Sequence, residues 1–367
     1  MRVHQDYWQN ASSGYRASKK VSELVEEARA EVASLIDARP EEVYFTSGGT
    51  ESNNTVIASA DALLGSEAKI ATSQIEHSAV LRPIERLETA GRTVHYVPVN
   101  AGGVIELDAL RSCQPQFVSM MWANNETGVI QPIKEVSEWA REGGIPFHTD
   151  AVQAVGKIAV SVQECPVSFL SMSAHKFHGP KGVGALYVKE GMRMQPAMLG
   201  GGQEGGMRSG TEDVASIVGM GVAAKTAAAQ LSSKEQQIRE RRDLFEQLVL
   251  EKVTGVSKNG ELHHRLSTHS HLSFQDCEAA GLLILLDEYG VQCSAGSACM
   301  TGKQQASHVQ VAMGIPEERA KSSLRFSLSH TTSKEDVSYA AEQVARAVKK
   351  LRSVQTTGIG PVTVYTP

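Results

Sequence analysis

The stretch EVYFTSGGTESNNTVIASADALL, residues 42 to 64, holds the pattern that decides the fold. A short run of β-forming residues breaks into Ser47-Gly48-Gly49-Thr50, and a helix-like segment follows directly. The same order recurs downstream, where KIATSQ precedes SAVLRPIERLETA and FVSMMWANNETG precedes IKEVSEWAREGG. Strands that alternate with helices are typical of a mostly parallel sheet covered on both faces, so we predict an α/β fold.

The length of 367 residues favours two packed units rather than one. The runs RTVHYVPV, PFHTDAVQ, FLSMSAHKF and GVGALYV continue the strand series, and a helix-like stretch from about Val214 to Leu250 closes it. After this stretch, HLSF, VQCS and a helix-like segment at 335–352 indicate a smaller α+β unit. We therefore expect a large domain over residues 1–235, a small C-terminal domain over 236–352 and a tail over 353–367.

Composition argues against several classes of protein. The net charge is -5, and no basic stripe indicates a nucleic-acid surface. No apolar run approaches the roughly 18 residues of a membrane span, and the N-terminus MRVHQDYWQN lacks a signal-peptide stretch. The five cysteines are too scattered for a disulfide framework. We expect a cytoplasmic protein that binds neither nucleic acid directly nor a membrane.

Polar residues cluster where the predicted strands end. These ends read SGGTES (47–52), IEHSAV (75–80), NNETG (124–128), HTDAVQ (148–153) and SAHKFHG (173–179). In a parallel sheet, ligands bind at the carboxyl ends of the strands. The five segments are therefore the candidate site.

Each polar residue also has a purely structural interpretation. The segment 47–50 suits a phosphate at a helix N-terminus, although such turns more often start an ordinary helix. Asp150 either holds a protonated heterocycle nitrogen or caps the next helix. His77 either stacks on a planar cofactor and moves protons or is a structural histidine. Lys176 is either a solvated lysine or an amine for Schiff-base chemistry.

The combination is more informative than any single residue. A phosphate cradle, His77, Asp150, Gln153 and Lys176 all lie at successive strand ends. Pyridoxal phosphate requires such a set: a phosphate site, an aspartate on its pyridinium nitrogen and a lysine on its aldehyde. This combination predicts a pyridoxal phosphate site.

Two other cofactor classes are disfavoured. His175 and His178 lack a third ligand, so no metal site is expected. The segment GGGQEGGMRSGT (200–211) neither follows the first strand nor opens a helix in a dinucleotide-binding unit, so a nicotinamide cofactor is not indicated.

Seven segments occur in the order seen in cysteine desulfurases: FTSGGTESNN, IEHSAVL, NNETGVIQPI, HTDAVQAVGKI, SAHKFHGPKGVGALY, GGGQEGGMRSGTED and SAGSAC. From about Asn10 to about residue 350, the chain resembles the nitrogen-fixation and iron–sulfur-assembly branch of these class V aminotransferase-like enzymes. The resemblance implies pyridoxal-phosphate fold type I, with a mostly parallel seven-stranded sheet in the large domain. It also implies conversion of L-cysteine to L-alanine, with the sulfur held as an enzyme persulfide and passed to an acceptor.

The resemblance assigns cofactor contacts to several residues. Lys176 would bind the aldehyde, Asp150 the pyridinium nitrogen and Gln153 the phenolic oxygen. His77 would stack on the ring and move protons. The residues that would hold the phosphate are Gly49, Thr50, Ser173, His175 and, across the interface of a homodimer, Thr211.

The resemblance also assigns substrate contacts. Asn125 would contact the cofactor and the substrate, and Arg325 would pair with the substrate carboxylate. Cys299, in VQCSAGSACMTG (291–302), would form the persulfide. The nearby Cys293 is expected to be a buried apolar thiol, with the alternative that it accepts or protects the persulfide.

Two differences from the family pattern bear on activity. The family opens with a Leu-Asp-Asn-Ala-Ala-Thr-Thr-like segment, and the start MRVHQDYWQNASSGYRAS matches only the part of the pattern after that segment. We therefore expect the N-terminal strand of the large domain to be missing. In the family this opening segment helps to close the substrate pocket, so its loss would affect pocket closure and activity. Near the nucleophile, Ala306 stands where proline is common, and this change could alter the choice of acceptor.

Alternatives to the desulfurase interpretation share its fold. A selenocysteine lyase or cysteine sulfinate desulfinase can work without an essential cysteine, and a catalytically impaired sulfur-transfer partner would bind cofactor without turnover. The sulfur acceptor could be an iron–sulfur scaffold, a tRNA-thiolation relay or a DNA-modification system, and the sequence does not choose among them.

Overall fold

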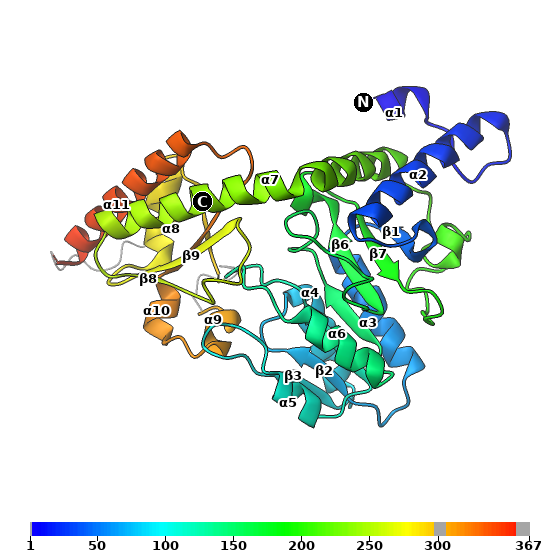
Figure 1. Cartoon of the computed structure of the whole chain (residues 1–367), viewed down its shortest axis with the longest axis horizontal. Coiled ribbons are helices and arrows are strands. Elements are labelled where there is room, and N and C mark those ends of the chain that lie inside the picture. The colour runs from blue at the N-terminus through cyan, green and yellow to red at the C-terminus, as the bar shows by residue number, and fades with distance from the viewer. Residues whose placement is uncertain (1, 297–305, 357–367) are drawn as a thin grey trace, which may run out of the picture. The chain divides into compact units, whose positions relative to one another are not determined.

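The computed structural model describes residues 2–296 and 306–356, and Figure 1 shows the course of the chain. The chain divides into two compact units. Unit 1 comprises Met1–Val99, Val104–Asn125 and Ile130–Ser232. Unit 2 comprises Asn100–Gly103, Glu126–Val129 and Ser233–Pro367. The change from unit 1 to unit 2 falls inside one helix, α7 (Val214–Lys252).

A seven-stranded sheet forms the centre of unit 1, in the order β1-β7-β6-β5-β4-β2-β3. Its strands are β1 (Val43–Thr46), β2 (Ile70–Ser73), β3 (Val94–Val97), β4 (Phe117–Met121), β5 (Phe147–Asp150), β6 (Phe169–Ser173) and β7 (Gly184–Val188). Strands β3, β2, β4, β5 and β6 run parallel, whereas β7 is antiparallel to both β6 and β1. The predicted α/β fold with a mostly parallel seven-stranded sheet is confirmed.

The helices of unit 1 precede, connect and follow these strands along the chain. They are α1 (Arg2–Asp6), α2 (Arg16–Leu35), α3 (Gly49–Leu63), α4 (Ser78–Thr89), α5 (Leu107–Ser112), α6 (Ile133–Glu142) and the first part of α7, with short 3-10 turns at Pro40–Glu42, Ala174–Phe177 and Glu204–Gly206. Helical apolar spacing explains α2, which buries Val21, Val25 and Val32 on one side. The described residues before β1 form helices and turns without a strand.

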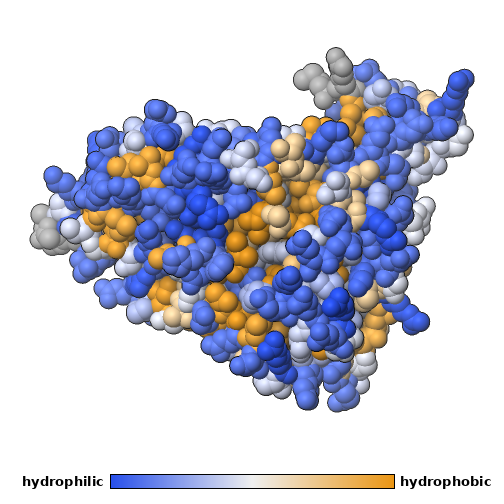
Figure 2. Space-filling model, in the orientation of Figure 1, coloured by the Kyte–Doolittle hydropathy of each residue, from blue (hydrophilic) through white to orange (hydrophobic). Residues whose placement is uncertain are grey.

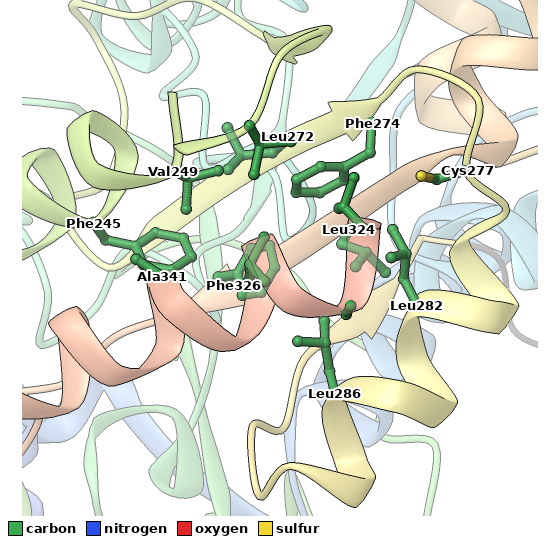
Figure 3. Packing of buried hydrophobic residues seen from close by; sticks show 14 of the residues in the cluster. Phe245, Val249, Leu272, Phe274, Cys277, Leu282, Leu286, Leu324, Phe326 and Ala341 are labelled. Carbon is green, nitrogen blue, oxygen red and sulfur yellow. The ribbon is translucent and has the colours of Figure 1, made fainter. Parts of the chain in front are cut away.

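Unit 2 is built on a smaller antiparallel sheet in the order β10-β11-β9-β8. Its strands are β8 (Val256–Lys258), β9 (His269–Phe274), β10 (Ser294–Ala295) and β11 (Ser323–Ser327), and its helices are the second part of α7, α8 (Ala279–Glu288), α9 (His308–Ala312), α10 (Glu317–Lys321) and α11 (Lys334–Thr356). Figure 3 shows one apolar face of this sheet, with Leu272, Phe274, Leu324 and Phe326, packed in a core with Phe245 of α7. The predicted terminal helix at 335–352 corresponds to α11.

Two short segments join unit 2 although their neighbours in the chain belong to unit 1. The N–H of Glu261 donates to the carbonyl of Gly102, and the N–H of Leu266 donates to the carbonyl of Gly128. These backbone bonds tie Asn100–Gly103 and Glu126–Val129 to the loop between β8 and β9. Such long-range pairing leaves no composition signal, which is why the sequence did not indicate it.

Helix α7 is long and apolar enough to cross a membrane by length and composition alone, and it is the one such helix among the described residues. Only 22% of its most apolar 18-residue window is buried. Lys225 interrupts the apolar residues of this helix, which is why the sequence did not indicate a membrane span here. Where the first half of α7 runs, Figure 2 shows hydrophobic residues at the surface.

Candidate active site

The phosphate cradle predicted from the sequence is the turn from β1 into α3. Gly48 has φ +150°, and a Cβ added to Gly49 would lie 2.5 Å from Cγ2 of Val152, so both positions require glycine. No side-chain hydrogen bond caps the start of this 15-residue helix. Its first N–H groups and the positive end of its dipole therefore suit an anion.

A salt bridge supports the cradle from outside. The N–H of Ser47 donates to Oε2 of Glu51 over 2.8 Å, and Nε of Arg208 donates to Oε1 of the same carboxylate over 3.0 Å. Arg208 belongs to the glycine-rich segment 200–211, which a buried ion pair between Glu204 and Arg29 holds in turn. The glycine-rich segment thus fixes the cradle, a role that its sequence did not indicate.

The end of β6 lies beside the cradle. Oγ of Ser173 is 3.7 Å from the position of a Cβ on Gly48, and it shares a 2.9 Å hydrogen bond with Nδ1 of His175. Burial lowers the pKa of His175, and the charges of Lys176, Lys181 and Lys157 lower it further. The lowered pKa favours the neutral form of His175, and the surrounding lysines suit a phosphate.

Asp150 lies buried at the end of β5, held by two donors. Nδ2 of Asn53 donates to Oδ2 over 2.7 Å, and the N–H of Val152 donates to Oδ1 over 3.0 Å. Burial raises the pKa of Asp150, and the opposing effects of these hydrogen bonds and of the charges of His77 and Lys176 reduce the rise without cancelling it. The structure thus brings three predicted residues, Asp150, His77 and Lys176, within electrostatic reach of one another.

His77 has a fixed orientation as the N-cap of α4. Its Nδ1 accepts the N–H of Ala79 over 3.0 Å, so the proton of the neutral ring is on Nε2. The ring itself is exposed. His77 can therefore be both a structural N-cap and a group that moves protons, because the cap uses Nδ1 and leaves Nε2 for proton exchange.

Glu76 is a fully buried carboxyl that was not among the residues predicted from the sequence. Its Oε1 accepts the Ser73 hydroxyl over 2.5 Å and the N–H of Met121 over 2.9 Å. Burial and, to a smaller extent, the charge of Asp150 raise the pKa of Glu76 to about 8, although these two hydrogen bonds oppose the rise. At neutral pH Glu76 is therefore mostly a neutral acid.

The remaining predicted residues of unit 1 lie in three places. Gln153 is half-buried, and its Oε1 accepts Nζ of Lys157 over 2.5 Å, which leaves its amide N–H groups to donate. Asn125 is half-buried after β4, and Thr50 is exposed in the first turn of α3. Thr211 is exposed and lines a groove with residues of the N-terminal segment such as Trp8. Among the described residues, no hydrogen bond links Thr211 to the cradle.

In unit 2, Arg325 is half-buried on β11, between His271 of β9 and Ser294 of β10 in the strand register. Burial lowers the pKa of Arg325, and the charge of Glu126 opposes this. Cys293 is partly buried, and burial raises its pKa to about 12, so it is a thiol at neutral pH. Cys299 lies outside the described residues.

The residues present fit pyridoxal phosphate. An uncapped helix start for a phosphate, a buried aspartate for a protonated ring nitrogen and a half-buried Lys176 for an aldehyde belong to the same unit. Among the described residues, no three His, Cys, Asp or Glu groups form a possible metal site.

Asn53, the donor to Asp150, was not predicted from the sequence. It could have been found there, because it lies four residues after Gly49 and so on the same side of α3.

Replacement of Asn53 by alanine is expected to weaken pyridoxal phosphate binding about 10- to 100-fold, the scale of one hydrogen bond to a charged group. Asp150 would lose its Nδ2 donor, which raises its pKa and makes it a weaker anion for a ring nitrogen. Absorbance titration of the cofactor-free protein measures the effect. Asn54→Ala is the control, because Asn54 bonds only backbone carbonyls. Equal losses in both variants would contradict the prediction.

Comparisons with known proteins agree on one family. A family model described as "Aminotransferase class-V" matches residues 1–339. The chain is 42% identical over 349 residues to "Cysteine desulfurase IscS" of Dictyoglomus turgidum, which covers 94% of this chain and 89% of that protein.

Two solved structures extend this similarity to three dimensions. A structure titled "NIFS-LIKE PROTEIN" superposes with a TM-score of 0.88 at 33% identity and covers 95% of this chain and 93% of its own. A second, "SspA in complex with cysteine", has a TM-score of 0.79 at 32% identity and covers 89% of this chain and 92% of its own.

Proposed function

The chain belongs to the aminotransferase class-V family and acts as a cysteine desulfurase, and from this premise we propose how its own residues carry out the reaction. Enzymes of this family depend on pyridoxal phosphate, and we propose that this chain binds it in unit 1. The observation that carries the proposal is the buried Asp150, which is held by Asn53 and lies in electrostatic reach of His77 and Lys176.

In this proposal, unit 1 holds the cofactor. Lys176 binds the aldehyde, Asp150 pairs with the ring nitrogen, and Gln153 donates an amide N–H to the phenolic oxygen. Gly49, Thr50, Ser173 and His175 hold the phosphate. When bound, pyridoxal phosphate supplies an electron sink that lets Cα of an amino acid lose its proton.

His77 moves protons at the reacting atoms. Because its Nδ1 accepts from the backbone of Ala79, Nε2 is the nitrogen that exchanges protons with the substrate. Asn125 contacts the cofactor and the substrate, and Arg325 pairs with the carboxylate of L-cysteine as a fixed cation.

Cys299 takes the sulfur. Its thiolate attacks the sulfur of the bound substrate, so that an S–S bond forms while the substrate C–S bond breaks. The electron pair of the C–S bond stays with the carbon fragment, which leaves as L-alanine after it gains a proton. The enzyme is left with a persulfide on Cys299.

We propose a homodimer in which Thr211 contributes to the phosphate site across the interface. Exposed apolar side chains in unit 1 support an interface, among them Val222 of α7, 62% exposed, and Leu199 just before the glycine-rich segment, 85% exposed. Sedimentation at micromolar concentration tests this, and a monomeric, fully active holoenzyme would contradict it.

We further propose that the persulfide sulfur passes to an acceptor protein, such as an iron–sulfur scaffold, in the cytoplasm. The relative from Dictyoglomus turgidum bears a name used for desulfurases of that pathway. For the substrate, support comes from SspA, whose structure is described as a complex with cysteine.

The desulfurase activity has a direct test. The purified protein is expected to be yellow and to release equal amounts of L-alanine and sulfide from L-cysteine when a reductant is present. Separate assays of alanine and of sulfide measure the two products. Sulfide release without alanine would contradict the proposed reaction, and a colourless protein that pyridoxal phosphate does not activate would contradict the cofactor.

A further inference from the structure

The sheet of unit 2 has a buried polar face as well as its apolar face. Side chains alternate along a strand, so residues next to Leu272 and Leu324 of the core point to the other side. His271 of β9 and Arg325 of β11 lie on this polar side and are directly paired in the register. His271 is fully buried. A buried histidine on a polar sheet face raises the question of what its two nitrogens bond.

Asn259 fixes one side of the His271 ring. Arg319 can only donate, and it donates to Oδ1 of Asn259 over 2.5 Å. The amide oxygen of Asn259 therefore faces Arg319, and the Nδ2 group faces Nδ1 of His271 at 3.0 Å. Because Nδ2 can only donate, Nδ1 of His271 is the acceptor.

The proton of His271 is consequently on Nε2. Burial, together with the charges of Arg325 and Arg319, lowers the pKa of His271 to about 3, so the ring is neutral and carries one N–H. Nε2 is buried and has no hydrogen-bond partner among the described residues. A buried N–H without a partner destabilises the folded chain, and a bound ligand that accepts from it would remove this cost.

Arg325 indicates which ligand suits this donor. Side chains directly opposite on neighbouring strands have Cβ atoms about 5 Å apart, and Arg325 acts on His271 more strongly than Arg319 does. An N–H and a guanidinium cannot bond each other, but the two oxygens of one carboxylate can accept from both. The carboxylate of the nearby Glu126 does not serve as this acceptor: it accepts the Ser307 hydroxyl over 2.6 Å, and Nε2 of His271 has no partner in the part of the chain that the structure describes.

We propose that Nε2–H of His271 donates to the α-carboxylate of the amino-acid substrate beside Arg325. His271 is then a second residue that selects substrates carrying an α-carboxylate, and Asn259 is the positioning residue that holds its tautomer. The inference rests on the proposed function, in which Arg325 binds this carboxylate.

The substitutions His271→Gln and His271→Asn distinguish the role of Nε2 from that of Nδ1. The amide of glutamine places an N–H near the Nε2 position, whereas the shorter asparagine reaches only the Nδ1 position. The holoenzyme of each variant is assayed for the KM of L-cysteine. Cysteamine, an aminothiol without a carboxylate, is assayed as a competitive inhibitor.

His271→Asn is expected to raise the KM of L-cysteine about 10- to 100-fold, the loss of one hydrogen bond to a charged group. Its kcat and the inhibition constant of cysteamine are expected to stay within about threefold, because neither depends on carboxylate binding. His271→Gln is expected to restore a KM near that of the wild type. Replacement of the exposed His264 by asparagine is the control.

Equal changes in the KM of L-cysteine and the cysteamine constant would show a structural role and overturn the inference. Arg325→Gln distinguishes this failure from failure of the proposed site. If Arg325→Gln raises only the KM of L-cysteine and His271→Asn does not, His271 alone is wrong. If Arg325→Gln leaves the KM of L-cysteine unchanged, the substrate carboxylate binds elsewhere, and the assignments of both Arg325 and His271 are wrong.

Discussion

Replacement of Lys176 by alanine is expected to give a colourless protein whose desulfuration rate is at least about 10³-fold lower, the scale on which removal of a covalent catalytic group acts. The amine of Lys176 is the group proposed to bind the cofactor aldehyde, and it lies half-buried in the turn after β6. Its removal takes away the covalent attachment of the cofactor. Absorbance of the purified protein and alanine release measure the two effects.

Lys181 provides a matched control for this variant. It lies five residues further along the same turn, is exposed, and like Lys176 contributes positive charge around His175. Lys181→Ala is expected to keep the colour and most of the rate. A yellow and active Lys176→Ala protein would disprove the assignment of Lys176, whereas equal losses in both variants would indicate that only the positive charge matters.

Replacement of Cys299 by alanine is expected to separate colour from turnover. The holoenzyme should remain yellow, because the proposed cofactor residues all belong to unit 1. Release of alanine from L-cysteine should fall at least about 10³-fold, because the sulfur loses its nucleophilic acceptor. Mass spectrometry after incubation with L-cysteine should find the added sulfur on Cys299 in the wild type and none in the variant.

Cys293→Ser is the matched control for Cys299. Burial raises the pKa of Cys293 to about 12, and a thiol that stays protonated is a poor nucleophile. We therefore expect unchanged turnover and an unchanged persulfide lifetime in Cys293→Ser. A shorter persulfide lifetime would favour the alternative that Cys293 accepts or protects the sulfur. Full activity of Cys299→Ala would instead point to lyase chemistry that needs no cysteine nucleophile.

Much of the fold could be predicted because its signals are local. The alternation of strands and helices in unit 1 and the terminal helix of unit 2 follow from apolar periods that a few neighbouring residues encode. The polar segments at the strand ends could be assigned to one site without knowledge of the strand order, since parallel strands end at one edge of the sheet. The electrostatic proximity of Asp150, His77 and Lys176 agrees with that expectation.

The partners of these residues could not be predicted in the same way. Asn53 and Asp150 are 97 residues apart, and Arg208 and Glu51 are 157 residues apart. Glu76 reads as an ordinary acidic residue in the sequence, but its burial between Ser73 and Met121 makes it a neutral acid at pH 7. None of these properties exists until the sheet has formed.

The class of fold, the family and the residue types that the chemistry requires follow from the sequence alone, because periodicity and ordered motifs are properties of short segments. The tertiary structure decided which donors meet which acceptors. The strand order β1-β7-β6-β5-β4-β2-β3 differs from the chain order, and hydrogen bonds between side chains depend on which strands are neighbours. The tautomer of His271, set through Asn259 by Arg319, is therefore a property that only the folded chain possesses.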